Sequence, residues 1–328
     1  MTPKHSSRRL RSLPCCAVAL FALASGCHST PKVDTPQDFE AKLRPLVAAH
    51  EWAAAESLID RRERALPGDA EVYVSRGNLY FQKAFGAMAN TTTGLPGAPA
   101  ADSTGNSRRE PDTLLVRRAM ESVRDGIARH PERLDMRFGL AYLLQQLGDP
   151  ESEFAVLSNA VAYAKQHPDS LRWTYGEPLP SPPDEYVPQV MHDYVRFYLE
   201  RDLPGDELPM LAIARLSAEA YPRNNRSTND VAFYYGTRGE WQRSLEFLHR
   251  AEQADSSDAL VLYNLGWAHE NLGHRSLAVR YYTRAVAAGE AGRMTDVAQS
   301  ARARLGQLRS APVAHAPMPA TAAPKDSS

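Results

Sequence analysis

Cysteine is scarce in this sequence, and the few cysteines present are not spaced to form bridges or bind metal. The 328 residues include three of them, with Cys15 and Cys16 inside an N-terminal apolar stretch and Cys27 shortly after it. No CxxC pair occurs. We expect the stretch with Cys15 and Cys16 to be removed, which leaves Cys27 alone and excludes an intramolecular disulfide, a CxxC redox site and a CxxC metal site.

Excess charge of either sign is also missing, because the formal net charge is −1. No basic stripe with interleaved aromatic residues occurs, so we expect no nucleic-acid partner. Neither a GxSxG elbow nor a GxxxxGK phosphate loop is present, and we expect no cofactor. Runs of β-branched residues are rare, whereas alanine, leucine, arginine and glutamate are common, which favours helices.

The N-terminus has the three-part layout of a secretory signal. Residues 1–12 are basic and polar, and residues 13–23 are apolar. That apolar stretch is too short to span a bilayer, which takes about 20 residues. Small residues then lead to Cys27, so the expected signal peptide is 1–26, followed by a linker at 27–35.

The end of this segment, LASGC, resembles the lipobox of bacterial lipoproteins. The resemblance implies that Cys27 is lipidated and anchors the exported chain in a membrane. His28 follows where an aspartate would imply retention at the inner membrane, so the outer membrane, facing the periplasm, is the expected location. The alternative is an ordinary cleaved signal with an unmodified cysteine.

An internal period organises the rest of the chain. Gly205, Gly239 and Gly273 are 34 residues apart, and ALVLYNLGWAHENLGHRSLAVRYYTRAVAAG surrounds the last of them. Leu265, Gly266, Ala268, Ala278, Tyr282 and Ala285 make this stretch similar to the tetratricopeptide repeat, a pair of antiparallel helices with small residues where they cross.

The resemblance implies an all-α, right-handed superhelical solenoid of about six helix pairs. We expect TPR-like units over 36–133, interrupted by a flexible insertion at 86–111, and a further unit at 134–167. An irregular proline-rich connection is expected at 168–190. Three units at 191–292, a capping helix at 293–309 and a disordered tail at 310–328 complete the expected organisation.

The stretch WAHENLGH resembles the zinc motif HExxH, in which two histidines stand one helical turn apart. Here His269 and His274 are five residues apart, and Gly273 between them marks a helix end. On a continuous helix this spacing would turn the two rings about 140° apart. We therefore expect the rings to point apart and no metal to bind.

In tetratricopeptide repeats the first helix of each pair lines a concave groove. The repeat register places several aromatic, amide and arginine residues in that groove. Side chains of these types suit recognition of an extended peptide or a helix. The alternative is that the aromatic residues pack against the neighbouring repeat. The candidate groove residues are Phe138, Tyr142, Val195, Arg196, Leu199, Arg226, Asn229, Phe233, Tyr263, Asn264 and Trp267.

These expectations describe a non-catalytic interaction scaffold of the bacterial envelope. Its partners would be one or more envelope proteins at the concave face, and the membrane through the lipid on Cys27. Two alternatives come from other functional classes. One is an envelope enzyme, such as a cell-wall hydrolase with its site under the 168–187 loop, and the other is a purely structural spacer.

Overall fold

The computed structural model describes residues 33–85, 111–201 and 203–310. The expected signal peptide at 1–26, nearly all of the expected insertion and the expected tail beyond Ser310 lie outside these described residues. In the described part the chain forms helices, a one-turn 3-10 helix and isolated bridges. The α-helices are α1 (Pro36–Ala48), α2 (Trp52–Ala65), α3 (Ala70–Phe85), α4 (Thr113–Arg129), α5 (Leu134–Leu147), α6 (Pro150–Gln166), α7 (Pro183–Arg201), α8 (Glu207–Ala220), α9 (Asn225–Thr237), α10 (Trp241–Ala254), α11 (Ala259–Asn271), α12 (Arg275–Ala291) and α13 (Thr295–Ser310).

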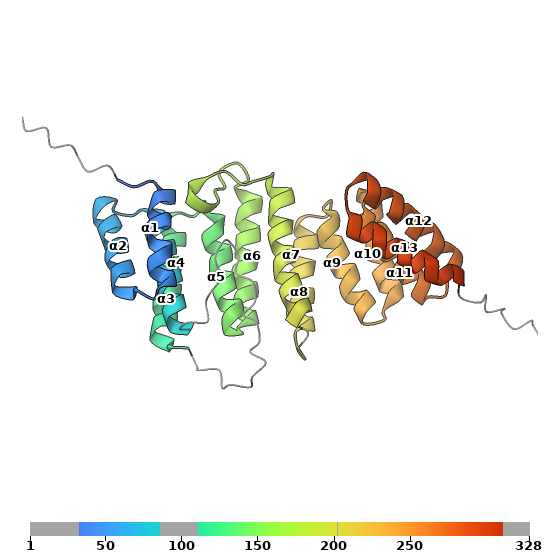
Figure 1. The fold of residues 1–328 in the computed structure, drawn as a ribbon, viewed down its shortest axis with the longest axis horizontal. Coiled ribbons are helices and arrows are strands. Elements are labelled where there is room, and N and C mark those ends of the chain that lie inside the picture. Colours follow the sequence, from blue (N-terminus) through green and yellow to red (C-terminus); the bar gives the residue numbers. More distant parts are fainter. Residues whose placement is uncertain (1–32, 86–110, 202, 311–328) are drawn as a thin grey trace, which may run out of the picture.

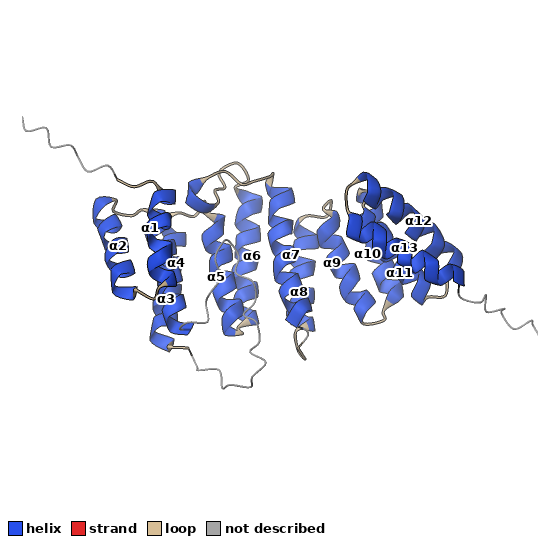
Figure 2. Ribbon diagram, viewed as in Figure 1, coloured by secondary structure: helices blue, strands red, loops and turns tan. Residues whose placement is uncertain are grey.

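The helices pack in sequential pairs, from α1 with α2 to α11 with α12, and form a row across the molecule (Figure 1; Figure 2). The last helix, α13, covers the open end by packing on α12 and α11. This confirms the predicted all-α solenoid of six pairs with a capping helix. None of the helices in the described part is both long and apolar enough to cross a membrane.

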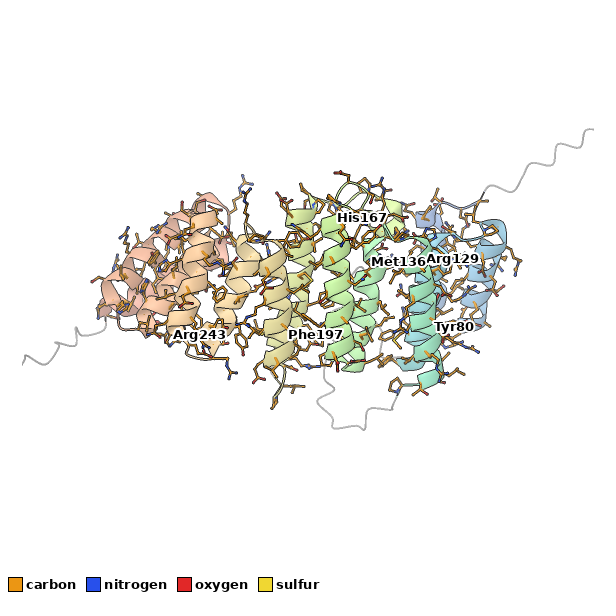
Figure 3. The ribbon with its side chains drawn as sticks, turned by 180° about the vertical axis from the view of Figure 1, so that it is seen from behind. Tyr80, Arg129, Met136, His167, Phe197 and Arg243 are labelled. Atoms are coloured by element: carbon orange, nitrogen blue, oxygen red, sulfur yellow. The ribbon has the colours of Figure 1, made fainter. Side chains whose placement is uncertain are left out.

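Close contact at a small residue fixes how the helices of a pair cross. A Cβ atom added at Gly266 of α11 would lie 2.6 Å from the Tyr282 ring of α12. Between successive pairs, a Cβ atom added at Gly126 of α4 would likewise lie 2.8 Å from Sδ of Met136, which Figure 3 labels on α5. Because real Cβ atoms do not approach so closely, glycine at these crossings lets large side chains fill the space beside them.

One boundary differs from the expectation. The connection predicted as irregular over 168–190 ends earlier, because α7 begins at Pro183. Proline suits the first turn of a helix, where its missing N–H would have no partner in any case, and Asp184 and Glu185 favour that turn electrostatically. Pro188 is tolerated within the helix. The prolines that indicated a loop therefore belong partly to a helix start.

The first helices approach one another in the C-terminal half. Helix α7 packs against α9, α9 against α11 and α11 against α13, whereas the second helices α8, α10 and α12 make little contact with one another. A row of helix pairs curves toward the side on which the helices are closer. The first helices therefore form the inner face of this half.

Between the third pair (α5 and α6) and the fourth pair (α7 and α8), the second helices make the contact instead of the first helices. There the second helices α6 and α8 are in contact, while α5 and α7 make little backbone contact. Aromatic side chains fill the space between α5 and α7. Phe138 is 1% exposed, its carbonyl accepts a hydrogen bond of 2.6 Å from the Tyr194 hydroxyl, and Trp173 of the connection packs over it.

Candidate binding surface

The first helices α7, α9 and α11 present the outward-pointing side chains of the candidate surface. Arg196 has 56% of its side chain exposed, and Leu199, one turn further along α7, is 37% exposed. Arg226 is exposed at the start of α9 and makes no hydrogen bond or ion pair with a described residue. We call Arg196, Leu199 and Arg226 the exposed triplet.

A pair formed by the half-buried His192 and the buried Asp230 links α7 and α9 beside this triplet. Nδ1 of His192 lies 2.8 Å from Oδ1 and 3.0 Å from Oδ2 of Asp230. Burial raises the pKa of Asp230, and its neighbours His192 and Arg226 oppose that shift. Arg196 follows His192 by one turn and Arg226 precedes Asp230 by one turn, so the two arginines flank the pair on opposite sides. Sequence reasoning missed this pair because its members are 38 residues apart.

The two asparagines predicted for the groove are buried. Nδ2 of Asn264 donates a 2.8 Å hydrogen bond to Oδ1 of Asn229, and both residues are about 5% exposed. Their amides are therefore engaged with each other and do not face a ligand. The pair holds α9 and α11 in register, because leaving a buried amide without a partner would cost about 1–3 kcal/mol.

The predicted aromatic residues on α9 and α11 are half-buried. The Trp267 ring lies 4.7 Å from that of Trp241 and 6.0 Å from that of Phe233, centroid to centroid. The Tyr263 ring lies 5.4 Å from that of Tyr282. Most of each ring therefore packs between neighbouring helices, as the alternative interpretation holds, and only part of each is accessible to a partner.

Two of the predicted residues are not accessible at all. Phe138 belongs to the space between α5 and α7, under Trp173, and Val195 is buried in the same core. Tyr142, also on α5, is half-buried beside Phe81, and burial raises its pKa to about 12. None of these three residues adds an exposed side chain to the surface of the exposed triplet.

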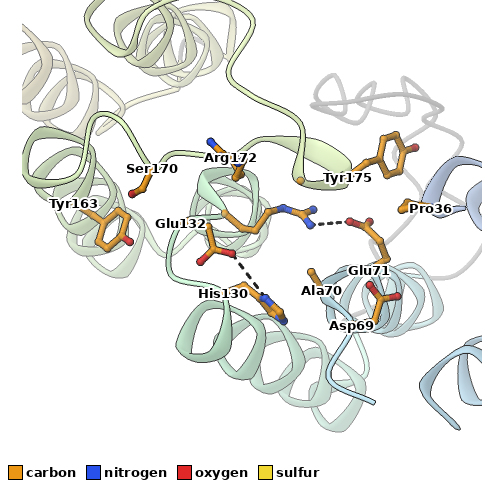
Figure 4. A pocket seen from close by; sticks show the side chains of 12 residues that line it. Pro36, Asp69, Ala70, Glu71, His130, Glu132, Tyr163, Ser170, Arg172 and Tyr175 are labelled. Carbon is orange, nitrogen blue, oxygen red and sulfur yellow. Dashed lines mark hydrogen bonds and ion pairs between the residues drawn. The ribbon is translucent and has the colours of Figure 1, made fainter. Parts of the chain in front are cut away.

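An open pocket of about 680 Å³ lies beside the connection that follows α6 (Figure 4). At its floor, Arg133 Nη1 lies 2.7 Å from Glu71 Oε1, and Arg133 also pairs with Asp135 at 2.7 Å. Burial raises the pKa of Glu71. The 168–187 loop, under which the alternative interpretation places an enzyme site, borders this pocket. The buried carboxylate of the pocket is paired with arginine, and the connection itself covers the Phe138 aromatic cluster.

The expectation for the two histidines of HENLGH is wrong in its geometry. Nδ1 of His269 and Nδ1 of His274 lie 3.2 Å apart. The angle expected on a continuous helix does not apply, because α11 ends at Asn271 and Gly273 adopts a φ of +75°. The turn carries His274 back toward α11, where its N–H donates a 2.8 Å bond to the carbonyl of His269.

Comparison with known proteins identifies the last helix pair. Residues 259–288 match the family model of the tetratricopeptide repeat. The sequence matches no curated protein.

Several solved structures are similar in fold. The C-terminal part of a TPR repeat-containing protein from Cytophaga hutchinsonii has a TM-score of 0.43 and 10% identity, covering 82% of this chain and 88% of that one. PilW, a widely conserved type IV pilus biogenesis factor, has a TM-score of 0.36 and 13% identity, covering 81% and 97%. The TPR2AB domain of yeast Sti1, in complex with pHSP90, has a TM-score of 0.34 and 8% identity, covering 84% and 98%.

The matched repeat coincides with α11 and α12, where Gly266 meets Tyr282. The described chain is therefore an all-α solenoid of paired helices, and its last pair matches the tetratricopeptide repeat.

Proposed function

We propose that this chain is a non-catalytic interaction scaffold of the bacterial cell envelope, anchored by a lipid on Cys27. It binds a peptide or helix of a partner protein on the first-helix face of α7, α9 and α11. The observation that carries the proposal is the exposed triplet, which stands on helices fixed by the His192–Asp230 and Asn229–Asn264 pairs. Because the helices are already fixed, binding does not have to order the backbone that carries these side chains.

The chemistry of this face defines the partner segment. A guanidinium donates paired hydrogen bonds to a carboxylate, and Arg226 makes no hydrogen bond or salt bridge with a carboxylate of the described residues, although its charge acts on the nearby Asp230. Leu199 and the accessible parts of Phe233 and Tyr263 supply apolar contacts. An amphipathic segment with acidic side chains fits this combination.

Site-specific photo-crosslinking in living cells tests the scaffold function. A photoreactive amino acid at Leu199 should yield a discrete crosslinked partner, whereas the same group at Arg117, exposed on the second helix α4, should not. Arg226→Glu should reduce the Leu199 crosslink by about tenfold, which corresponds to about 1.4 kcal/mol. Equal crosslinking at both positions, or none at Leu199, would contradict the proposed face.

Metabolic labelling tests the anchor. The layout of residues 1–27 supports lipidation, because a basic segment, an apolar segment and small residues precede Cys27. A fatty-acid probe should label the wild-type chain and should not label Cys27→Ala. Absence of label on the wild type, or label that persists on Cys27→Ala, would leave an ordinary cleaved signal as the better explanation.

A further inference from the structure

Two imidazole rings meet at the turn between α11 and α12. His269, at the end of α11, is only 6% exposed, while His274 is exposed at the start of α12. Their Nδ1 atoms are 3.2 Å apart. The backbone of the turn brings the two residues together, since the His274 N–H donates to the His269 carbonyl. The separation is therefore built into the fold.

The neighbouring side chains fix the position of the buried ring. The Tyr281 ring stacks on His269 at 5.4 Å, with 9° between the ring planes. His249 of α10 lies on another side, its ring 6.3 Å from that of His269. Burial, with His274 and His249 adding to it, lowers the pKa of His269. A neutral imidazole is the form that binds metal ions.

We propose that the Nδ1 atoms of His269 and His274 form a binding site for a divalent transition-metal ion such as Cu²⁺, Ni²⁺ or Zn²⁺. Zinc binds histidine nitrogen at about 2.0–2.1 Å, so two nitrogens 3.2 Å apart would make an angle of about 100° at the ion, close to tetrahedral. In the empty site one Nδ1–H donates to the other Nδ1. On binding, that proton is transferred to Nε2 of its own ring, which leaves both Nδ1 lone pairs free.

The site has two protein ligands. No group of three or more His, Cys, Asp or Glu side chains in the described ranges is placed to hold a metal. Water would fill the remaining positions, and His249 is the nearest further imidazole. Affinity should follow the general order for nitrogen ligands, with Cu²⁺ bound most tightly and Mg²⁺ not bound. The site lies in the α11–α12 turn and does not use the exposed triplet of the proposed partner face.

Titration of the full chain with CuCl₂ and NiCl₂ by calorimetry tests the proposal. The protein should carry no affinity tag. Its three cysteines, which all lie outside the described residues, should be alkylated first so that thiols do not bind the ion. One ion per chain should bind, and His274→Ala should weaken binding by at least about tenfold, because even the loss of an outer-shell partner costs about 10–100-fold. His274 is exposed and its side chain caps no helix amide, so its removal should lower the melting temperature by only a few degrees through the lost contact with His269.

His167→Ala is the matched control, because it removes an exposed histidine at the end of α6 and should leave the affinity unchanged. The electron paramagnetic resonance spectrum of bound Cu²⁺ should show coupling to imidazole nitrogen in the wild type, and that coupling should be reduced in His274→Ala. The proposal fails if the wild type does not bind Cu²⁺, or if His274→Ala binds it as tightly as His167→Ala does.

Discussion

The junction between α9 and α11 and the junction between α5 and α7 join equivalent helices in different ways. At the first, the helices touch directly and a buried Asn229–Asn264 hydrogen bond links them. At the second, the helices are held apart by Phe138 and Tyr194, and the connection covers the gap with Trp173. A repeated register therefore fixes which helix a residue occupies but leaves its exposure to the local packing.

The largest expected effect comes from two phenylalanines predicted for the same groove. Phe138→Ala should lower the free energy of unfolding by about 3–5 kcal/mol, because it empties a fully buried site. Phe233→Ala should cost clearly less, since that ring is only half-buried. Urea unfolding followed by circular dichroism measures both. Equal losses would mean that the two junctions are packed alike.

A buried carboxyl group gives the α5–α7 region its own pH dependence. Glu153 is fully buried and accepts a 2.9 Å hydrogen bond from Gln145 and another from the Tyr198 hydroxyl. Burial raises the pKa of Glu153 to about 7, a shift that the hydrogen bonds from Tyr198 and Gln145 and the charge of Arg201 oppose. The folded chain therefore holds a proton that the unfolded chain releases near its ordinary pKa of 4.5.

The direction of the change in stability with pH follows from the difference between the folded and unfolded pKa values of Glu153. Stability from the protonated carboxyl is fully present below about pH 4.5 and is lost as pH rises through about 7. Glu153→Gln should abolish this loss. Between pH 4.5 and pH 8, the free energy of unfolding of the wild type should fall by up to about 3 kcal/mol more than that of the variant. Urea unfolding at the two pH values measures it. Glu151→Gln, at an exposed position on the same helix, is the control and should keep the wild-type pH profile.

Two glycines on first helices should respond differently to a larger residue. Gly266→Val places a Cβ 2.6 Å from the Tyr282 ring and should cost about 1–3 kcal/mol through overpacking. Gly139→Val, on α5, meets nothing within 4 Å and should be close to neutral. Thermal melts of the two variants measure the difference. If Gly139→Val proved as damaging as Gly266→Val, close helix crossing would not explain the glycine of the repeat.

The smallest effect is expected at a turn. Gly273 gives the α11–α12 turn a φ of +75°, whereas Arg293 before α13 adopts a φ of +59° with a side chain that disfavours it. Arg293→Gly should raise the free energy of unfolding by about 0.5–1 kcal/mol, because glycine reaches this region without strain. The opposite change, Gly273→Arg, should lower it by a similar amount. A loss of stability in Arg293→Gly would show that the arginine side chain has a packing role.

The regular half of the fold was predictable because local signals there agree. Gly239 and Gly273 mark turns, and Gly266 with Tyr282 marks a helix crossing, so the 34-residue register alone places the helices. The start of α7 was not predictable in the same way. Pro183 and Pro188 favour a loop by composition, and only the packed helix shows that they are tolerated.

The candidate surface was predictable only in part, because exposure depends on contacts between distant residues. The register placed Arg196, Leu199 and Arg226 on first helices, where the structure shows them exposed. It also selected Phe138, which the sequence alone could not show to be covered by Trp173. The His269–His274 contact depends on where α11 ends, and helix ends are the least certain feature of a sequence-based prediction.

The connection after α6 also has a mechanical consequence. A solenoid in which each repeat contacts only its neighbours behaves as a spring, and its bending stiffness is set by each interface in turn. Backbone bonds tie Arg172 to Glu132 at 2.8 Å and to Leu134 at 2.9 Å, and Trp173 packs against Tyr186 at the start of α7. This brace spans two pairs. Pulled from its ends, the chain would extend first in the pairs outside this brace and last around α5–α7.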